Sequence, residues 1–171
     1  DLRVFYLKKQ KKINIYSNKL TAKYLYKNFS YCFVKNYDYP AILNLKPLKK
    51  VFRLGDVGGK IDIRAVNVKH GLIDSIAYII NKKIAYVSDV NEFYKKDYAH
   101  FNNLKYLIID CLRFNKHPSH FNLEDVLQIV NSLKPRKTIL TNLHSDLDYN
   151  NLLKILPNNI TPGYDGLTVN I

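Results

Sequence analysis

The chain has 171 residues, of which 47% are hydrophobic, and its formal net charge is +13. A sequence of this length and composition can bury a substantial core, which excludes general disorder. No apolar run is long enough to span a membrane, and the lysine-rich start lacks the apolar centre of a signal peptide, so we expect a cytoplasmic protein without a membrane partner.

The charged and rare residues add further constraints. Lysine, spread along the chain, makes up most of the positive excess, and arginine, the better bidentate ligand of phosphate, is scarce. A solvated lysine surface and a nucleic-acid-binding face are both compatible with this charge. Cys32 and Cys111 have no CxxC spacing and are expected to be buried free thiols. Methionine is absent, so the chain lacks an initiator residue and is interpreted as part of a longer protein.

The first sixty residues predict short elements. Residues 13–16 (INIY) predict a strand, and after a polar break a helix is expected through Leu20 and Leu25. Between residues 30 and 60, prolines interrupt short apolar pieces, which is typical of irregular loops and edge strands.

The middle of the chain predicts a β-rich region. Residues 60–68 alternate apolar and polar side chains around an expected bulge and end at His70. Two apolar arms then flank the polar turn at residues 81–83, which predicts a hairpin whose second arm ends at Ser88 and Asp89.

The last third predicts strands that alternate with helices. Residues 104–110 are a continuous apolar run of the buried-strand kind that ends at Asp110. A helix is expected from an N-cap at Asn122 to Lys134. The remaining elements are a strand at 137–140, a short helix at 150–156 and an extended segment at 163–171. The alternation indicates an α/β protein, and the hairpin indicates a mixed sheet within one domain.

Polar residues collect where these strands end. His70, Asp89, Asp110 and residues 142–148 each follow a strand, and sites in α/β sheets gather outside strand ends. Each also has a plain structural interpretation: His70 as a turn residue, and Ser88 or Asp89 as the N-cap of a helix over residues 90–95. Asp110 is harder to explain this way, because an ionised carboxylate rarely lies unpaired in a buried strand.

Two further groups carry histidines. Pro118 stiffens the turn HPSH, which presents His120 near the start of a helix, where it could donate a proton to a phosphate oxygen; a surface loop is the alternative. The stretch LTNLHSDLDY at residues 140–149 fits either a turn with Asp148 as N-cap or the rim of a metal site. His100 is assigned no role.

The serial order of the motifs resembles a known family. The motifs are HG at 70–71, AYVSDV at 85–90, LIIDCLR at 107–113, HPSHFNLEDVL at 117–127, LTNLHSDLDY at 140–149 and YDGL at 164–167. They resemble the C-terminal two thirds of the metallo-β-lactamase-fold hydrolases, and most closely the branch of phosphoribosyl 1,2-cyclic phosphate phosphodiesterases of the carbon-phosphorus lyase pathway. The resemblance implies an αββα sandwich with mixed sheets, in which residues 1–171 are a single domain without its N-terminal part.

The start of the chain fits the same branch. There a THxHxDH metal motif is followed, after a Gly-rich turn, by Asp-Leu-Arg, and this chain opens with Asp1, Leu2 and Arg3. The resemblance therefore implies that a histidine-rich motif, with about half of the metal ligands, precedes residue 1.

The resemblance also assigns roles to individual residues. His70 matches the first downstream metal ligand, Asp89 the carboxylate that bridges two metals, and His120 a histidine near the substrate phosphate. The family's last ligand is a histidine, but here that position is Asn142. Either His144 binds instead, Asn142 binds weakly through its carbonyl oxygen, or the second ion is poorly held. We favour His144, because imidazole suits zinc or manganese better than an amide does.

The implied activity of the intact protein is hydrolysis of a phosphodiester, such as a small cyclic phosphate, with two divalent ions, Zn or Mn, bridged by Asp89 and a hydroxide. His120 would stabilise or protonate the leaving oxygen. One alternative is a tRNA 3′-end endonuclease of the same fold, which the charge suits, although no Gly- or Pro-rich insertion resembles its tRNA-binding arm.

Another alternative is a non-catalytic basic binding module. The 171 residues hold only His70, Asp89 and His144 of the implied ligands, so this fragment alone is expected to be inactive and to bind metal weakly. Whether the protein forms a homodimer is left open.

Overall fold

The structure is a computed structural model that describes residues 2–36, 39–56 and 58–170. The chain divides into two compact units, Asp1–Lys49 and Lys50–Ile171, and each is described by itself. The expected match to the family at Asp1 lies outside the described residues. The single domain expected over residues 1–171 stays a prediction.

The first unit contains three helical segments and a small sheet. Its elements are α1 (Arg3–Lys9), β1 (Ile13–Ser17), α2 (Lys19–Asn28), the 3-10 helix η1 (Ser30–Cys32) and β2 (Leu43–Pro47). The strand and the helix predicted from residues 13–25 are confirmed, and α1 was not expected. Helix α2 begins where it does because the side chain of Asn18 accepts a hydrogen bond from the backbone N–H of Thr21 at 2.8 Å. β1 and β2 pair in parallel.

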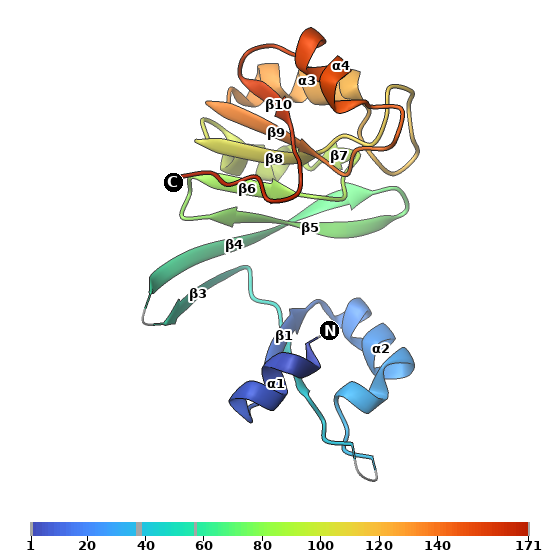
Figure 1. The fold of residues 1–171 in the computed structure, drawn as a ribbon, viewed down its shortest axis with the longest axis vertical. Coiled ribbons are helices and arrows are strands. Elements are labelled where there is room, and N and C mark those ends of the chain that lie inside the picture. The colour runs from blue at the N-terminus through green and yellow to red at the C-terminus, as the bar shows by residue number, and fades with distance from the viewer. Residues whose placement is uncertain (1, 37–38, 57, 171) are drawn as a thin grey trace. The chain divides into compact units, whose positions relative to one another are not determined.

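The second unit is built on a mixed sheet. Its elements are β3 (Val51–Asp56), β4 (Gly59–His70), β5 (Ile73–Ile80), β6 (Ile84–Val87), β7 (Glu92–Phe93), the 3-10 helix η2 (Lys95–Phe101), β8 (Tyr106–Asp110), α3 (Leu123–Leu133), β9 (Lys137–Thr141), α4 (Tyr149–Ile155) and β10 (Ile160–Pro162). The strand order is β10-β9-β8-β6-β5-β4-β3, and β7 pairs with β4 (Figure 1). Strands β3 to β6 are antiparallel and β6, β8, β9 and β10 are parallel, which confirms the mixed sheet.

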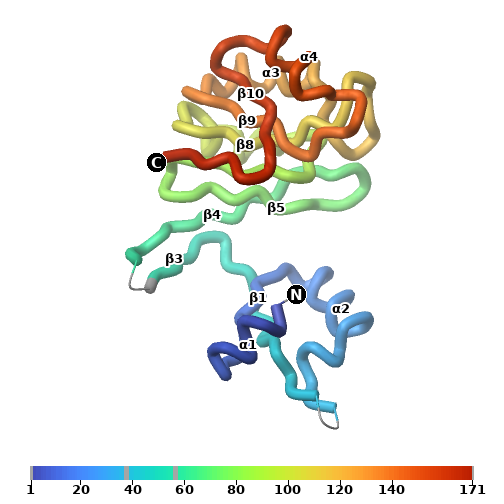
Figure 2. The backbone as a smooth tube through the Cα atoms, in the orientation of Figure 1, coloured from blue at the N-terminus to red at the C-terminus, as the bar shows by residue number. Residues whose placement is uncertain are grey.

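The main core lies on one face of this sheet. Alternate residues of the strands are buried there, among them Val68, Ala77, Val87, Leu107, Ile109 and Leu140. Helix α3 packs into the same core with Val126, Val130 and Leu133. Val126 and Val130 lie on the apolar face that the periodicity predicted, whereas Leu127, also expected there, is exposed. After β10 the chain passes β9 and β8 as the red segment of Figure 2, and its residues line a pocket together with Ile108 and Ile139.

Local signals account for several confirmed boundaries. The hairpin between β5 and β6 turns at Asn81 and Lys82, which both have positive φ, and Lys83 N–H bonds the carbonyl of Ile80 at 2.9 Å. Asn122 caps α3 by accepting from Asp125 N–H at 2.9 Å, and Lys134 ends the helix in the left-handed conformation.

Two sequence predictions are wrong. No bulge interrupts β4, because its pairing with β5 runs in continuous register from Ile63 to His70. Instead, β4 changes from exposed to buried along its length, and its first apolar residue, Ile61, is exposed. Residues 90–95 form no helix, because residues 92–93 are drawn into the sheet as β7 beside β4. The segment over residues 163–170, which was expected to be extended, is assigned to no helix or strand; it follows β10, which pairs in parallel with β9.

Both cysteines are free, and Cys111 is buried as expected, whereas Cys32 is half-buried. Within the described residues, none of the helices combines the length and the apolar character that a membrane crossing needs.

Candidate metal centre

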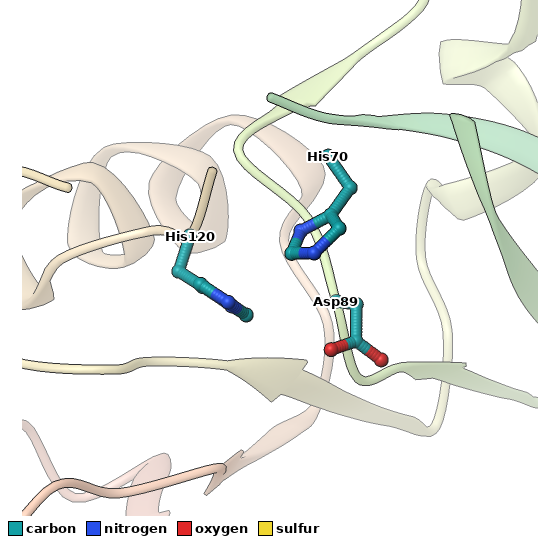
Figure 3. A group of neighbouring side chains, drawn as sticks. All are labelled: His70, Asp89 and His120. Carbon is teal, nitrogen blue, oxygen red and sulfur yellow. The ribbon is translucent and has the colours of Figure 1, made fainter. Parts of the chain in front are cut away.

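Three side chains converge beyond the ends of β4 and β6. His70 is the last residue of β4, Asp89 follows β6 by two residues, and His120 lies in the loop before α3. One ligand atom from each of the three lies within 4.8 Å of the other two. Figure 3 shows both imidazole rings and the carboxylate directed toward one shared space. Of the positions singled out from the sequence, these three are brought together.

The loop that carries His120 fixes the orientation of His70. His70 Nδ1 lies 2.7 Å from the carbonyl oxygen of Ser119, which can only accept, so Nδ1 carries the proton. The other ring nitrogen, Nε2, is then left with its lone pair for a metal ion. A backbone carbonyl that holds one nitrogen of a metal-binding histidine is a common arrangement around such ions.

Gly71 allows the two loops to approach this closely. Its φ is +63°, and a Cβ at this position would lie 3.0 Å from the Cβ of Ser119. Any other L-residue would strain the backbone and push the loop away. The turn predicted at His70 and Gly71 is therefore real, and it positions His70 for the site.

Asn91 connects the same loops and was missed by sequence reasoning. Its Oδ1 accepts from Gly71 N–H at 2.9 Å, and its Nδ2 donates to the carbonyl of Pro118 at 3.2 Å. Its position two residues after Asp89 was the only signal in the sequence. Asp89 itself does not cap a helix; its Oδ2 accepts from the hydroxyl of Ser88 at 2.8 Å.

A buried carboxylate holds His120. The side chain of Asp110 is 0% exposed, and its Oδ2 lies 2.6 Å from His120 Nδ1. Asp110 also accepts from Val90 N–H at 3.1 Å and from Asn142 Nδ2 at 3.0 Å. Because the carboxylate already accepts two N–H groups, we assign the third proton to His120 Nδ1. His120 Nε2 is then directed into the space shared with His70 and Asp89.

Burial raises the pKa of Asp110 above its ordinary value, because the charged form is desolvated; the hydrogen bonds from Val90, His120 and Asn142 oppose this rise. The neighbouring thiol of Cys111 is affected more strongly: burial, with the charge of Asp110, raises its pKa to about 12. Cys111 is therefore an unreactive core residue.

The stretch 140–149 divides between the site and the next helix. Asn142, with a positive φ of 61°, turns its amide N–H toward Asp110. His144 lies outside the group formed by His70, Asp89 and His120; its Nδ1 is 2.9 Å from Asp146 Oδ1. Asp148 caps α4 by accepting from Asn151 N–H at 2.9 Å, which confirms the turn interpretation for that residue.

The pKa of Asp146 is set by opposing effects of its neighbours. Burial alone would raise its pKa, but the hydrogen bonds from His144 and from the backbone N–H of Phe114 lower it below the ordinary value. The contact with Asp146 occupies Nδ1 of His144 and leaves Nε2 available.

His117 lies beside the site without joining the group. Its ring centroid is 5.2 Å from that of His120, and burial, with the nearby charge of Arg113, lowers its pKa. A lowered pKa keeps His117 neutral at neutral pH.

The three converging residues fit a divalent metal ion. Zinc binds imidazole nitrogen and carboxylate oxygen at about 2.0–2.2 Å, so ligand atoms in a tetrahedral site lie about 3.4 Å apart. Small side-chain rotations would bring atoms that are within 4.8 Å to that spacing. Both histidines also have the second partner that orients a ligand, Ser119 for His70 and Asp110 for His120.

Comparison with known proteins identifies the family. A family model described as "Beta-lactamase superfamily domain" matches residues 1–142. An octanoyltransferase of Porphyromonas gingivalis (strain ATCC BAA-308 / W83) is 27% identical over 110 residues, which are 63% of this chain and 22% of that protein. The chain thus spans about a fifth of the length of this curated relative.

Solved structures agree in fold. A diphosphatase of the PhnP family superposes with a TM-score of 0.81 at 24% identity, over 94% of this chain and 59% of its own. The short form of human tRNase Z superposes with a TM-score of 0.63 at 13% identity, over 94% of this chain and 67% of its own. The family model covers more than half of the sequence, and the mixed α/β sheet matches these structures, so the chain belongs to the beta-lactamase superfamily domain family and has the metallo-β-lactamase fold.

Proposed function

We propose that this chain is part of a metal-dependent hydrolase that cleaves a phosphodiester, with a small cyclic phosphate such as phosphoribosyl 1,2-cyclic phosphate as substrate. The observation that carries the proposal is the buried Asp110–His120 pair directed at the space shared with His70 and Asp89. The fold likeness to a diphosphatase of the PhnP family supports the phosphorus chemistry.

In this proposal His70 and Asp89 are metal ligands. The atoms that they offer, an imidazole nitrogen and carboxylate oxygens, suit Zn or Mn. When bound, divalent ions supply an activated water and neutralise charge on the phosphoryl oxygens. Asp89 would be a ligand shared by both ions.

His120 acts as the proton donor. As the water oxygen forms its bond to phosphorus and the bond to the ester oxygen breaks, protonated His120 gives the Nε2 proton to the leaving oxygen. The Asp110 carboxylate, 2.6 Å from Nδ1, stabilises the imidazolium before the transfer and keeps the ring in place. General-acid catalysis of this kind contributes about 10²–10⁴-fold in rate.

The second ion needs further donors. With His120 as the proton donor, His70 and Asp89 are the ligands that the convergent group supplies, and two ions need more donors than these. We propose that His144, held by Asp146 at Nδ1, supplies one of the missing donors through Nε2, and that the others come from outside these 171 residues. The chain by itself is therefore expected to bind metal weakly and to be inactive.

The test uses the longer protein, loaded with Zn or Mn, and a cyclic ribose phosphate. His120→Ala should lower kcat by about 10²-fold or more while the metal content stays unchanged. Unchanged hydrolysis by His120→Ala would rule out the assigned role, and hydrolysis without metal would rule out the class of reaction.

A tRNA 3′-end endonuclease is the second candidate, favoured by the net charge of +13 and by the fold likeness to human tRNase Z. Salt separates the two candidates. Binding of RNA should weaken steeply as salt rises, whereas binding of a small cyclic phosphate should change little.

A further inference from the structure

The positive charge is concentrated in the smaller unit. Asp1–Lys49 contains eleven basic and two acidic side chains, a net charge of +9, which leaves +4 of the total +13 for residues 50–171. Residues 2–37 contain no acidic residue. The basic residues are thus concentrated in Asp1–Lys49, although lysines occur along the whole chain.

Among the described residues, the lysines of Asp1–Lys49 have no acidic partner. The ion pairs between described residues are Arg53–Asp62, Lys69–Glu92, Asp110–His120 and His144–Asp146, and all of them lie in Lys50–Ile171. In the described part of Asp1–Lys49 no lysine has an ion-pair partner. The positive electrostatic potential of Asp1–Lys49 can therefore attract an external polyanion.

Helix α2 arranges three of the lysines in a row. Lys19, Lys23 and Lys27 are spaced by four residues, so they lie on one side of the helix, and all three are exposed. Tyr24 (63% exposed) and Leu20 (72% exposed) lie beside this row. The opposite side carries Leu25, which packs against the small core of Phe33, Ile42 and Leu43. Figure 2 shows α2 as the light-blue helix beside β1.

A cavity lined by tyrosines lies in the same unit. Its volume is about 520 Å³, within the usual range for ligand pockets, and its walls include Arg3, Tyr6, Tyr31, Cys32, Asn36 and Tyr39. The guanidinium carbon of Arg3 lies 5.9 Å from the ring centre of Tyr39. Tyr31 belongs to η1, which begins two residues after α2 ends. Aromatic rings and a cation around one cavity suit a flat aromatic group such as a nucleobase.

We propose that Asp1–Lys49 binds single-stranded nucleic acid, with phosphates along Lys19, Lys23 and Lys27 and a base in the tyrosine cavity. Proteins that hold single strands combine a basic surface for the backbone with aromatic rings for the bases, and this unit has both. A membrane surface fits less well, because α2 has only ten residues and its exposed side carries a single aliphatic residue. The inference does not depend on the proposed phosphodiesterase activity and can fail without affecting it.

The experiment measures the anisotropy of a labelled oligouridine of about 16 nucleotides, with the whole 171-residue chain, over a range of salt concentrations. The triple variant Lys19/Lys23/Lys27→Gln should bind about tenfold more weakly or worse. Its plot of log affinity against log salt should be less steep by about 2, because each lost phosphate contact to a single strand removes about 0.7. The variant with all three lysines changed to Arg should bind as the wild type does.

Substitutions in the tyrosine cavity should affect the affinity for the oligonucleotide but not its salt dependence. Tyr31/Tyr39→Leu keeps apolar volume but removes two aromatic faces, so it should weaken binding about tenfold at every salt concentration without changing the slope. Tyr86→Leu, at an exposed tyrosine of the other unit, is the matched control and should bind normally.

A second triple variant, Lys60/Lys95/Lys154→Gln, is the control for net charge. It changes three exposed lysines of the other unit and likewise removes three positive charges. This control should bind within about threefold of the wild type, because these lysines lie outside the proposed binding surface and exposed charges that make no phosphate contact are screened by salt. An equal loss in both triple variants would show that only net charge matters and overturn the proposal. Binding of the wild type to anionic phospholipid vesicles but not to the oligonucleotide would also overturn the proposal.

Discussion

His120 Nδ1 lies 2.6 Å from Oδ2 of the fully buried Asp110 side chain, although the two residues are ten positions apart in the sequence. The carboxylate also receives N–H groups from Val90 and Asn142. All of its partners thus come from loops that follow β6, β8 and β9, the strands whose ends form the site. This arrangement leads to specific expectations.

Asp110→Asn should lower the rate of phosphodiester cleavage by the longer, metal-loaded protein by about 10²-fold or more, because a neutral amide neither stabilises protonated His120 nor holds its ring. The alkaline limb of the pH profile of kcat/KM, where a proton donor loses its proton, should shift in the variant. A variant with wild-type rate and an unshifted profile would mean that Asp110 has only a packing role.

The pH dependence of stability should also reveal the raised pKa of Asp110. Burial raises its pKa above the value in the unfolded chain, about 3.9. The native state then binds more protons between the two pKa values, so the stability contributed by protonated Asp110 is present below about pH 4 and is lost as the pH rises through the raised pKa. Urea unfolding at several acidic pH values measures this. The unfolding free energy of the wild type minus that of Asp110→Asn should fall with rising pH, and a rise would contradict the raised pKa.

Measurements of metal affinity should distinguish the metal ligands of the centre from the residues that do not bind metal. His70→Ala and Asp89→Ala should each weaken binding of Co²⁺ or Zn²⁺ strongly, because each removes a ligand atom. His144→Ala should weaken it at least tenfold, because it removes a donor that Asp146 orients.

Asn142→Ala is the matched comparison, because its amide N–H is directed at Asp110. Calorimetry on the longer protein should show little change in metal affinity for this variant. Loss of an ion in Asn142→Ala with none in His144→Ala would assign the ligand to Asn142.

Gly71→Ala should destabilise the fold and disturb His70. The alanine would have to adopt a φ of +63° and place its Cβ 3.0 Å from that of Ser119. We expect a loss of about 1–3 kcal/mol in the free energy of unfolding. Gly166→Ala is a useful control, because Gly166 also has a positive φ but a Cβ there would meet nothing within 4 Å. A smaller loss for Gly71→Ala than for Gly166→Ala would disprove the close approach to Ser119.

The two thiols should react differently. Because burial raises the pKa of Cys111 to about 12, a disulfide reagent at pH 8 should modify Cys32 and spare Cys111 in the folded chain. Denaturant should expose the second thiol. Modification of both at equal rates without denaturant would mean that the core around Cys111 opens readily.

The sequence by itself determined features that depend on near neighbours. Asn122 and Asp148 begin helices because a side-chain oxygen accepts an N–H three residues ahead, and that contact can be inferred from local sequence. The apolar run that ends at Asp110 and the polar turn at Asn81 are likewise local. The serial order of the motifs was enough to indicate the family.

Only the tertiary structure decided which side chains meet at the site. His70 faces a carbonyl 49 residues away, and the side-chain N–H of Asn142 donates to Asp110, 32 residues away. The strand β7 replaced the expected helix because its pairing partner, β4, is distant in the sequence. These outcomes depend on which strand ends become neighbours, and that choice is made by burial of the whole sheet face, which no local pattern encodes.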